Sequence, residues 1–191
     1  MHKLVFATNN SHKISEVSAI LGSEFNLLNL KEVGIFTDLP ENENTIEGNA
    51  LSKARFVYEK SGNDCFADDT GLFVDSLKGE PGVYSARYAG EECNSEENIK
   101  KLLHNIEGKS SRKAHFKTIV ALIIGGREYA FEGIINGEIL TEKRGNKGFG
   151  YDPVFRPEGY SLSFAEMSPD LKNKISHRAL AIKALSDFLK A

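Results

Sequence analysis

Basic residues stand at three positions where the sequence indicates that a helix begins. Lys13 falls in the first turn of one expected helix, and the run Ser176-His177-Arg178 opens another. Lys172 follows Ser168-Pro169-Asp170, a helix-start pattern with proline at its first position. The unpaired N–H groups and the macrodipole of a helix N-terminus disfavour a cation there by about 0.3–1 kcal/mol. A bound anion such as phosphate would remove the conflict. Solvated lysine and arginine side chains are the simpler alternative.

The adjacent carboxylates Asp68-Asp69 stand before Thr70-Gly71, at the expected end of a short strand. Neighbouring residues of a strand point to opposite faces, so at most one of the two enters a given pocket. That carboxylate could bind Mg²⁺ or accept a proton from water, although the run is also typical of a solvated turn. Glu41, Glu43 and Glu47 could add a second magnesium ligand, or they could form a loop rim and a helix cap.

The run Gly148-Phe149-Gly150-Tyr151-Asp152 combines glycines with two aromatic rings. Glycine lets the backbone approach a ligand closely, and the Phe149 ring offers a face on which a nucleobase could stack. A tight turn with two half-buried aromatic rings is the alternative. The chain has no phosphate-loop motif, no Gly-x-Ser-x-Gly motif and no cysteine-centred nucleophile. No metal-ligand spacing is formed by His2, His12, His104 and His115. The run, the basic helix starts and the paired carboxylates together predict a phosphorylated, magnesium-dependent ligand that carries a flat ring.

Helix and strand patterns alternate along the chain and position these residues. A buried strand is expected at Leu4 to Thr8, followed by a polar turn and a helix that ends at Gly22. Asn44 and Glu47 form an approximate cap for a second helix that ends at Gly62. The further elements expected are a strand at 64–67 and another from Leu72, a helix between Asn94 and Gly108, strands at 114–124, 127–135 and 138–142, and helices that start at Ser168 and Ser176.

Two dipeptides in the β-rich middle of the chain are turn signals. Gly125-Gly126 separates two strand patterns, which predicts a hairpin, and Asn136-Gly137 marks a second turn. Helices that alternate with strands, together with this antiparallel ribbon, predict the α/β class with a mixed sheet.

Length and composition predict one globular domain, spanning 1–191, with two lobes. The 191 residues are 40% hydrophobic and 27% charged, values that are typical of a globular protein and exclude a disordered chain. The longest clean apolar run, Ile119 to Ile124, is far short of the ~20 residues that cross a bilayer. The apolar stretch near the N-terminus is too short for a signal peptide. We therefore expect no membrane partner.

Charge and cysteine content narrow the class of partners further. Lys and Arg total 24 against 27 Asp and Glu, a net charge of −3 that provides no positive field for a nucleic-acid polymer. Cys65 and Cys93 have no Cys-x-x-Cys spacing, which is typical of a reducing compartment and argues against a zinc knuckle. The sequence thus indicates a cytoplasmic enzyme or binding domain.

Five motifs, in order along the chain, resemble those of the inosine triphosphate pyrophosphatase family, whose members hydrolyse nonstandard purine nucleoside triphosphates. The motifs are Thr8-Asn9-Asn10-Ser11-His12-Lys13, Ala67-Asp68-Asp69-Thr70-Gly71-Leu72, Gly79-x-Pro81-Gly82-Val83-Tyr84-Ser85-Ala86-Arg87, Gly148-Phe149-Gly150-Tyr151-Asp152-Pro153 and Ser176-His177-Arg178. The resemblance spans residues 1 to 190, and five ordered motifs are far more specific than any one of them.

The resemblance implies an activity, a fold and a cofactor. The expected reaction cleaves ITP, dITP and XTP between the α and β phosphates. It gives the monophosphate and pyrophosphate with Mg²⁺, and it keeps these nucleotides out of DNA and RNA. The expected fold is a two-lobed α/β protein, with a mixed sheet, flanking helices and an active site in the cleft between the lobes. The expected assembly is a homodimer.

Carried over by position, the resemblance assigns roles to the motif residues. Asp69 would be the general base and a magnesium contact, Glu41 would be the best-matching acidic partner for the metal, and Thr70 would touch the substrate. The triphosphate would be held by Thr8, Asn9, Asn10, Ser11, His12 and Lys13. The base and ribose would be surrounded by Phe149, Gly150, Tyr151, Asp152, Lys172, His177 and Arg178.

Two of these assignments stay open. Family members often read Glu-Asn-Ala where this chain has Glu47-Gly48-Asn49-Ala50, so the metal partner could be Glu41, Glu43 or Glu47. The long side chain of Lys172 could reach either a phosphate or the edge of the base.

Three other functions fit parts of the sequence. A nucleotide pyrophosphatase of the septum-inhibitor type, which prefers modified pyrimidines, is disfavoured by the Ser-His-Arg and Gly-Phe-Gly-Tyr-Asp motifs. A nucleotide sensor that binds without hydrolysis is disfavoured by Asp69 in a potential base position. An RNA-binding module is disfavoured by the net charge of −3 and by the lack of an Arg/Lys-rich aromatic sheet motif.

Overall fold

The computed structural model describes residues 2–22 and 25–191, and within it the chain divides into two compact units. The first unit consists of residues up to Asp69 with Thr118–Gly133 and His177–Ala191, and the second consists of Thr70–Lys117 with Ile134–Ser176. Three of the four divisions fall inside the strands Cys65–Val74, Lys113–Ile124 and Arg127–Ile139, and the fourth falls between two helices.

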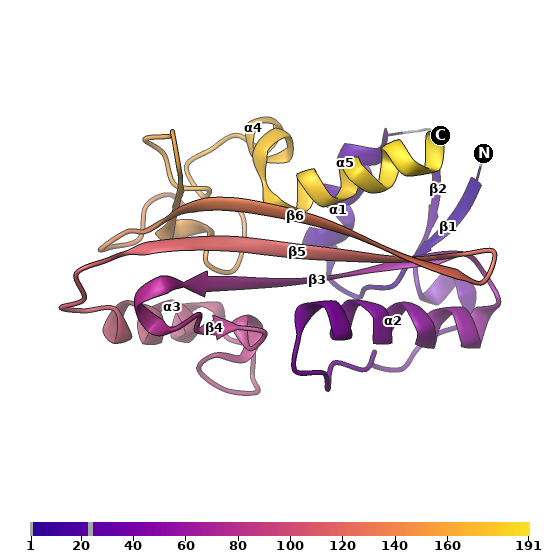
Figure 1. Ribbon diagram of the computed structural model, residues 1–191, viewed down its shortest axis with the longest axis horizontal. Helices are drawn as coiled ribbons and strands as arrows, with labels where there is room; N and C mark the ends of the chain where they lie inside the picture. The colour runs from indigo at the N-terminus through magenta and orange to yellow at the C-terminus, as the bar shows by residue number, and fades with distance from the viewer. Residues whose placement is uncertain (1, 23–24) are drawn as a thin grey trace. The chain divides into compact units, whose positions relative to one another are not determined.

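Helices and strands follow one another along the chain in the expected α/β manner (Figure 1). In chain order they are β1 (His2–Phe6), α1 (Ser11–Leu21), β2 (Phe25–Leu28), η2 (Lys31–Val33), α2 (Ile46–Ser61), β3 (Cys65–Val74), η3 (Asp75–Leu77), β4 (Pro81–Gly82), η4 (Ser85–Arg87), α3 (Ser95–Asn105), β5 (Lys113–Ile124), β6 (Arg127–Ile139), η5 (Asp152–Val154), β7 (Phe155–Pro157), α4 (Pro169–Ile175) and α5 (His177–Lys190). The strands of the described residues form one seven-stranded sheet in the order β2-β1-β3-β5-β6-β7, with β4 paired to β3. β1 runs parallel to β2 and β3, whereas β4 pairs antiparallel to β3 and β7 to β6. The predicted α/β class with a mixed sheet is confirmed.

In the first unit, helices cover both faces of the strands. Leu4 and Phe6 of β1 join a buried cluster with residues of α1 and α5, namely Val17, Leu21, Ala181, Ile182 and Leu185. The opposite face is covered by α2, where the Cys65 thiol of β3 donates to the Ala54 carbonyl at 3.2 Å. Figure 1 shows α2 on one side of these strands and α1 with α5 on the other. Strand alternation thus gives these strands one face toward α1 and α5 and the other toward α2.

The second unit has its own core, built where α3 packs on the strands. Leu72, Phe116 and Phe155 from three strands meet Leu102 of α3 in one buried cluster. The Phe116 and Phe155 rings pack edge to face, with centroids 4.7 Å apart. Tyr151 is buried in the same cluster, so the glycine-rich segment that contains it is anchored in this core.

The turn predicted at Asp68-Asp69-Thr70-Gly71 is wrong, because β3 continues through it. Both carboxylates pair with basic residues inside the first unit and do not require a solvated turn. Gly71 permits a close contact between strands, since a Cβ at this position would lie 2.7 Å from the Gly82 carbonyl oxygen of β4. The glycine therefore serves strand packing and not a change of chain direction.

The turn predicted at Asn136-Gly137 is also wrong, and for the same reason. β6 continues to Ile139, and Gly137 pairs with Pro157 of β7. A Cβ on Gly137 would lie 2.3 Å from the Arg156 carbonyl oxygen. The hairpin predicted at Gly125-Gly126 is confirmed, since both glycines have positive φ and connect β5 to β6.

Most helix starts follow the predicted caps. Asn94 and Ser168 accept backbone N–H hydrogen bonds at the starts of α3 and α4, as expected. The cap expected at Asn44 is wrong by one residue, because Thr45 Oγ1 accepts the Gly48 N–H at 3.0 Å. The boundary differs because both neighbours are good capping residues, and the geometry of the preceding loop decides between them.

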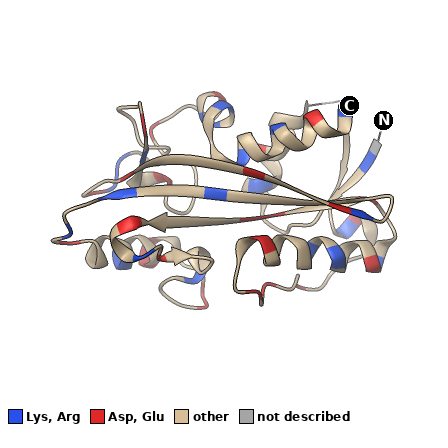
Figure 2. Cartoon of the chain, viewed as in Figure 1, with Lys and Arg blue, Asp and Glu red and all other residues tan. Residues whose placement is uncertain are grey.

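Two features of the described residues bear on the partners of the chain. None of their helices combines the length and the apolar character needed to cross a membrane. Figure 2 shows Lys and Arg interspersed with Asp and Glu along the helices and strands, in agreement with the net charge of −3.

Gly133 of β6 determines how closely the start of α5 approaches the sheet. A Cβ at this position would lie 2.0 Å from the His177 carbonyl oxygen and 2.6 Å from the Ala181 nitrogen. We expect Gly133→Ala to displace the first turn of α5 and to lower stability by about 1–3 kcal/mol, as overpacking does. Urea unfolding measures this change. Ile134→Thr, a β-branched substitution at the neighbouring position that is 40% exposed, serves as the control and should stay within ~0.5 kcal/mol of the parent protein. Equal stability of both variants would contradict the close approach.

Candidate active site

Asp68 and Asp69 occupy adjacent positions of β3 and point to opposite faces of the sheet, as strand alternation predicts. Asp68 faces α1 and α5 and is 1% exposed. Its Oδ1 accepts a hydrogen bond from Lys13 Nζ at 2.9 Å, and its Oδ2 accepts one from Arg178 Nε at 3.1 Å. Asp69 faces α2, which supplies its partners. The two carboxylates therefore belong to two separate clusters of charged groups.

The first cluster couples Asp68 to two cations. Arg178, which is 2% exposed, also donates through Nη1 to Glu16 Oε2 at 2.5 Å. Burial alone would raise the pKa of Asp68, but Lys13 and Arg178 outweigh burial and hold that pKa well below its usual range. Burial is the larger effect on Lys13 and lowers its pKa, while the charge of Asp68 opposes this. Asp68 is thus ionised at neutral pH and fixes both basic side chains.

These pairs explain the basic residues at the helix starts. Lys13 and Arg178 lie in the first turns of α1 and α5, and each reaches a carboxylate. Lys172 also reaches a carboxylate, with its Nζ 2.7 Å from Asp152 Oδ2, but it lies in the last turn of the short helix α4, where a cation is favourable. Carboxylates of the chain itself therefore offset the unfavourable position of Lys13 and Arg178. The sequence suggested two explanations, a bound anion or full solvation, and neither is required.

β1 ends at Phe6, two residues before its predicted end. The polar segment Thr8–Lys13 therefore covers part of the connection to α1 and the first turn of that helix. The Asn10 N–H donates to Thr8 Oγ1, and the Lys13 N–H donates to Asn10 Oδ1, both at 3.1 Å. These two hydrogen bonds fix the turn that starts α1. The exposed side chains of the segment are those of Asn9, Asn10, Ser11 and His12.

The second cluster consists of Asp69, Lys53, Glu41 and Asn49. Asn49 and Lys53 are buried on α2, about one helical turn apart. Asn49 Nδ2 lies 3.1 Å from Asp69 Oδ2, and Lys53 Nζ lies 3.4 Å from Asp69 Oδ1. Lys53 Nζ also donates to Glu41 Oε1 at 2.6 Å. One ammonium group thus contacts both carboxylates.

Burial dominates the electrostatics of Asp69. It raises the pKa of Asp69, and the charges of Lys53 and Lys13 offset it only in part. Burial opposes the charge on Lys53 as well, but Asp69 and Glu41 outweigh it and raise the pKa of Lys53. The cluster therefore holds a carboxylate of increased basicity beside a charged lysine, which is a suitable arrangement for proton transfer from water.

Sequence reasoning missed Lys53 and Asn49. Both lie on the face of α2 that also buries Ile46, Ala50 and Val57. Lysine is rarely buried without a partner of opposite charge. A lysine and an asparagine at this spacing within an apolar stripe were therefore a signal of a buried carboxylate opposite α2.

Of the three glutamates that the sequence left open, Glu41 is the one that meets the Lys53 ammonium next to Asp69. Glu43 is held through its backbone N–H, and Glu47 lies in the first turn of α2. Among the described residues, no three His, Cys, Asp or Glu side chains form a group that could hold a metal. The carboxylate oxygens of Glu41 and Asp69 nevertheless suit Mg²⁺, which commonly takes one or two carboxylates and completes its shell with phosphates and waters.

In the second unit, Asp152 ties several of the predicted base-binding residues together. Its Oδ2 accepts hydrogen bonds from the Phe149 N–H at 2.8 Å and from Lys172 Nζ at 2.7 Å. The Lys172 ammonium lies 4.9 Å from the centroid of the Phe149 ring, a cation–π contact. Gly148 has φ +74°, and a Cβ on it would lie 2.0 Å from Asp152 Oδ2. Glycine is therefore required for the segment to close on this carboxylate.

The remaining predicted residues differ in how far they are exposed. Tyr151 is buried, and its hydroxyl donates to the Ser85 carbonyl at 2.8 Å. Thr70 is half-buried on β3, and Gly150 has φ +60° with open space around it. His177 opens α5 and is 4% exposed. The Tyr151 hydroxyl is thus used inside the protein.

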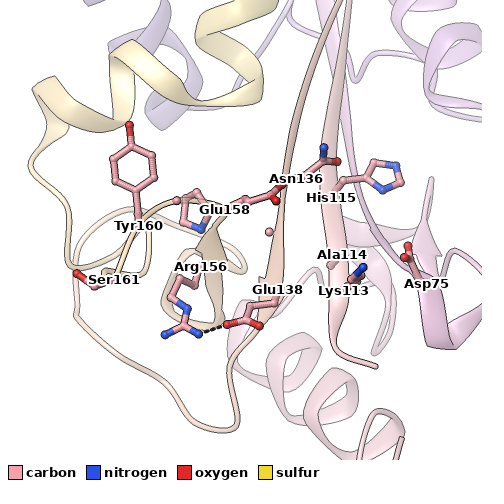
Figure 3. Close-up of a pocket in the computed structure, with 13 residues that line it drawn as sticks. Asp75, Lys113, Ala114, His115, Asn136, Glu138, Arg156, Glu158, Tyr160 and Ser161 are labelled. Atoms are coloured by element: carbon pink, nitrogen blue, oxygen red, sulfur yellow. Dashed lines mark hydrogen bonds and ion pairs between the residues drawn. The ribbon is translucent and has the colours of Figure 1, made fainter. Parts of the chain in front are cut away.

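A cavity of about 770 Å³ also lies in the second unit, and none of the predicted site residues lines it. Figure 3 shows His115 of β5, Asn136 and Glu138 of β6, and Arg156 of β7 around this cavity, with Arg156 paired to Glu138. The lining mixes acidic and basic side chains. The charges of its lining therefore largely cancel.

These observations define an α/β protein with a mixed sheet in which one strand presents two carboxylates to two clusters of basic residues. A sequence profile of the Ham1 family matches residues 4–188, and the chain belongs to that family. The resemblance drawn from the five motifs is confirmed.

Relatives agree with this membership over almost their whole length. A dITP/XTP pyrophosphatase of Porphyromonas gingivalis is 53% identical over 190 residues, which cover 99% of this chain and 98% of that protein. A dITP/XTP pyrophosphatase of Flavobacterium johnsoniae is 51% identical over 189 residues, with the same coverage. Among solved structures, the HAM1 protein of Coxiella burnetii is 36% identical, with a TM-score of 0.92 over 100% of this chain and 99% of that one. The Staphylococcus aureus Ham1 protein is also 36% identical, with a TM-score of 0.90 over 98% of each chain.

Neutralising Asp68 removes a charge partner from Lys13 and from Arg178. Because breaking a buried ion pair leaves a poorly compensated charge, we expect Asp68→Asn to lower stability by about 3–5 kcal/mol near neutral pH. Arg55→Ala is the control, since Arg55 and Glu128 form an ion pair whose side chains are 54% and 40% exposed and whose loss should cost less than ~1 kcal/mol. Denaturant unfolding of both variants measures the difference.

The pH dependence of the same variant provides a second check. The folded pKa of Asp68 is lowered, so its stabilising contribution is complete above the unfolded value of about 3.9 and is lost as pH falls through the folded value. The gap in stability between the parent protein and Asp68→Asn should therefore narrow as the pH falls below ~4. A gap that stays constant into acid would contradict the depressed pKa.

Proposed function

We propose that the chain is a nucleoside triphosphate pyrophosphatase that hydrolyses dITP, XTP and ITP to the monophosphate and pyrophosphate with Mg²⁺. It thereby keeps nonstandard purine nucleotides out of DNA and RNA. Relatives named dITP/XTP pyrophosphatase are 51% and 53% identical to it. The observation that carries the proposal is Asp69, a carboxylate of raised pKa beside Lys53 and close to Glu41.

Asp69 acts as the general base in this proposal. It takes a proton from a water molecule, and the water oxygen forms a bond to the α phosphorus. The bond between the α phosphorus and the oxygen that bridges to the β phosphate breaks, and pyrophosphate leaves. Asn49 and Lys53 each contact one oxygen of Asp69, at 3.1 and 3.4 Å. The base is therefore oriented before substrate binds.

Magnesium binds at Glu41 and Asp69 in this proposal. The support is that Lys53 Nζ contacts both carboxylates, at 2.6 and 3.4 Å, so Glu41 and Asp69 lie beside one another and offer oxygen ligands of the kind that Mg²⁺ prefers. The chemistry that the metal supplies when bound is neutralisation of negative charge on the departing pyrophosphate. The phosphates of the substrate provide further oxygen ligands.

The triphosphate binds at Thr8–Lys13, with Thr70 as a further substrate contact. In support, the segment presents exposed polar side chains beside the N-terminus of α1, where N–H groups and the helix dipole favour an anion. The Lys13 side chain is 15% exposed and is held in place by Asp68. It can therefore contribute charge to a bound phosphate while it keeps its carboxylate partner.

We assign binding of the base and ribose to Phe149–Asp152 and Lys172 and, on the family resemblance alone, to His177 and Arg178. The ammonium of Lys172 lies against the Phe149 ring, which favours contact with the edge of a stacked base over contact with phosphate. ITP and XTP present a 6-oxo acceptor where ATP presents an amino donor. Basic side chains at this edge would leave donors unpaired against ATP, at about 1–3 kcal/mol for each group.

The proposal places the enzyme in the cytoplasm as a homodimer with no nucleic-acid polymer as a partner. Cys65 and Cys93 are both free thiols, which supports a reducing compartment. The dimer is supported by the family resemblance alone. The net charge of −3 supports small nucleotides over polymers.

A panel of nucleoside triphosphates tests the proposed reaction. With Mg²⁺ we expect dITP, XTP and ITP to give monophosphate and pyrophosphate, with kcat/KM for ATP lower by at least ~10-fold because of the unpaired donors. Chelation of the metal should abolish turnover. Phosphorus NMR identifies the products. Release of orthophosphate would contradict cleavage between the α and β phosphates, and binding without any product would support a nucleotide sensor.

Replacement of the proposed base tests the role of Asp69. Asp69→Asn should lower kcat for dITP by about 10²–10⁴-fold, the usual contribution of a general base, while calorimetry still detects bound dITP. Asp64→Asn is the control, because Asp64 precedes the same strand and its carboxylate accepts the Gly125 N–H, at 2.9 Å. The control should retain the kcat of the parent protein. If Asp69→Asn keeps its turnover and its dependence on Mg²⁺, the base is another carboxylate.

A further inference from the structure

The segment Gly79–Arg87 is one of the five motifs, yet no role in the reaction has been assigned to it. In the second unit this segment pairs with β3 just after Thr70, with Gly82 opposite Leu72. Ser85 fixes the contact, since its Oγ accepts the Leu72 N–H at 2.8 Å and donates to the Gly82 carbonyl at 2.6 Å. Ser85 is 7% exposed. Its hydroxyl therefore acts entirely within the fold.

The backbone of the same serine also contacts the glycine-rich segment. The Ser85 carbonyl accepts the Tyr151 hydroxyl at 2.8 Å. Asn98 of α3 supports this position, since its Nδ2 donates to the Ala86 carbonyl at 2.7 Å and its Oδ1 accepts the Ala89 N–H at 2.6 Å. Ser85 thus connects β3, two residues after Thr70, to the segment Gly148–Asp152.

We propose that Ser85 and Tyr151 are positioning residues that set the orientation of the base-binding segment relative to the part of β3 that carries Thr70. This inference rests on the function proposed above. The Tyr151 ring is buried in the core and its hydroxyl is directed to Ser85, so it acts through its neighbour Asp152. Asp152 in turn holds the Phe149 N–H and the Lys172 ammonium.

The hydrogen bond between Ser85 and Tyr151 affects recognition of the base and not cleavage of the bond between the α and β phosphates. Asp69 and its partners Lys53 and Asn49 belong to the first unit and make none of these contacts. Loss of the Tyr151 hydroxyl should therefore loosen the Phe149–Asp152–Lys172 arrangement and raise KM, while kcat stays close to that of the parent enzyme.

Tyr151→Phe is the test variant because it keeps the buried ring and removes only the hydroxyl. We expect KM for dITP to rise about three- to tenfold, the value of one buried hydrogen bond, with kcat unchanged. We also expect the ratio of kcat/KM for dITP to that for dATP to fall. Inhibition by inorganic tripolyphosphate, which has no base, should keep the same Ki.

Tyr88→Phe is the matched control. Tyr88 is buried in the same core, and its hydroxyl donates to Glu80 at 3.0 Å and accepts from Asn105 at 2.7 Å. Its loss removes partly buried hydrogen bonds of a tyrosine hydroxyl, and these bonds do not reach the glycine-rich segment. We expect both variants to lose stability to a similar extent, while Tyr88→Phe keeps the KM and the base selectivity of the parent enzyme.

The outcomes separate this inference from the proposed function. Failure of the parent enzyme to release pyrophosphate from dITP overturns the function itself. With an active parent enzyme, the inference is overturned if Tyr151→Phe keeps its KM. It is also overturned if KM for dITP and Ki for tripolyphosphate rise together, or if Tyr88→Phe shows the same loss of selectivity. Ser85→Ala, which removes the bond to Leu72, should reproduce the change in selectivity.

Discussion

Two adjacent carboxylates in one strand impose the main constraint on the first unit. Because a β-strand alternates its faces, Asp68 and Asp69 must be neutralised from opposite sides. An unpaired charge at either position would cost several kcal/mol, so cations reach Asp68 from α1 and α5, and Lys53 reaches Asp69 from α2. The helices that bury the apolar faces of the sheet are therefore also the helices that carry the charges. Packing and electrostatics fix the same arrangement.

Close approach of backbones makes these pairings possible. Arg178 can reach Asp68 only if the first turn of α5 lies near the strands. Gly133 permits this approach because it has no side chain to clash with the His177 carbonyl group. In the second unit, the missing side chain of Gly148 lets Asp152 close on the Phe149 N–H. In each unit the position of a charged side chain thus depends on a glycine. Gly133 has this role for Arg178, and Gly148 has it for Asp152.

Sequence patterns predict the structural features that depend on neighbouring residues. They do not predict features that depend on a partner far away in the chain. The α/β class, the hairpin at Gly125-Gly126 and the opposite faces of Asp68 and Asp69 follow from periodicity and turn chemistry. Gly71 and Gly137 were misinterpreted as turn residues, because the carbonyl oxygens that require them belong to other strands. Lys53 was missed for the same reason, since its carboxylate partners lie outside α2. The basic residues at helix starts stand out in the sequence, but local patterns do not predict their carboxylate partners.

The charges of the first unit give an electrostatic reason for a metal in the proposed reaction. The two clusters contain three cations and four carboxylates, namely Lys13, Lys53 and Arg178 against Glu16, Glu41, Asp68 and Asp69. These side chains therefore offer a triphosphate no surplus of positive charge, even though each lysine is well placed. Helix N–H groups compensate only part of the charge of a phosphate chain. In the proposed reaction, Mg²⁺ would supply the missing positive charge, and Glu41 and Asp69 would be the carboxylates that hold it.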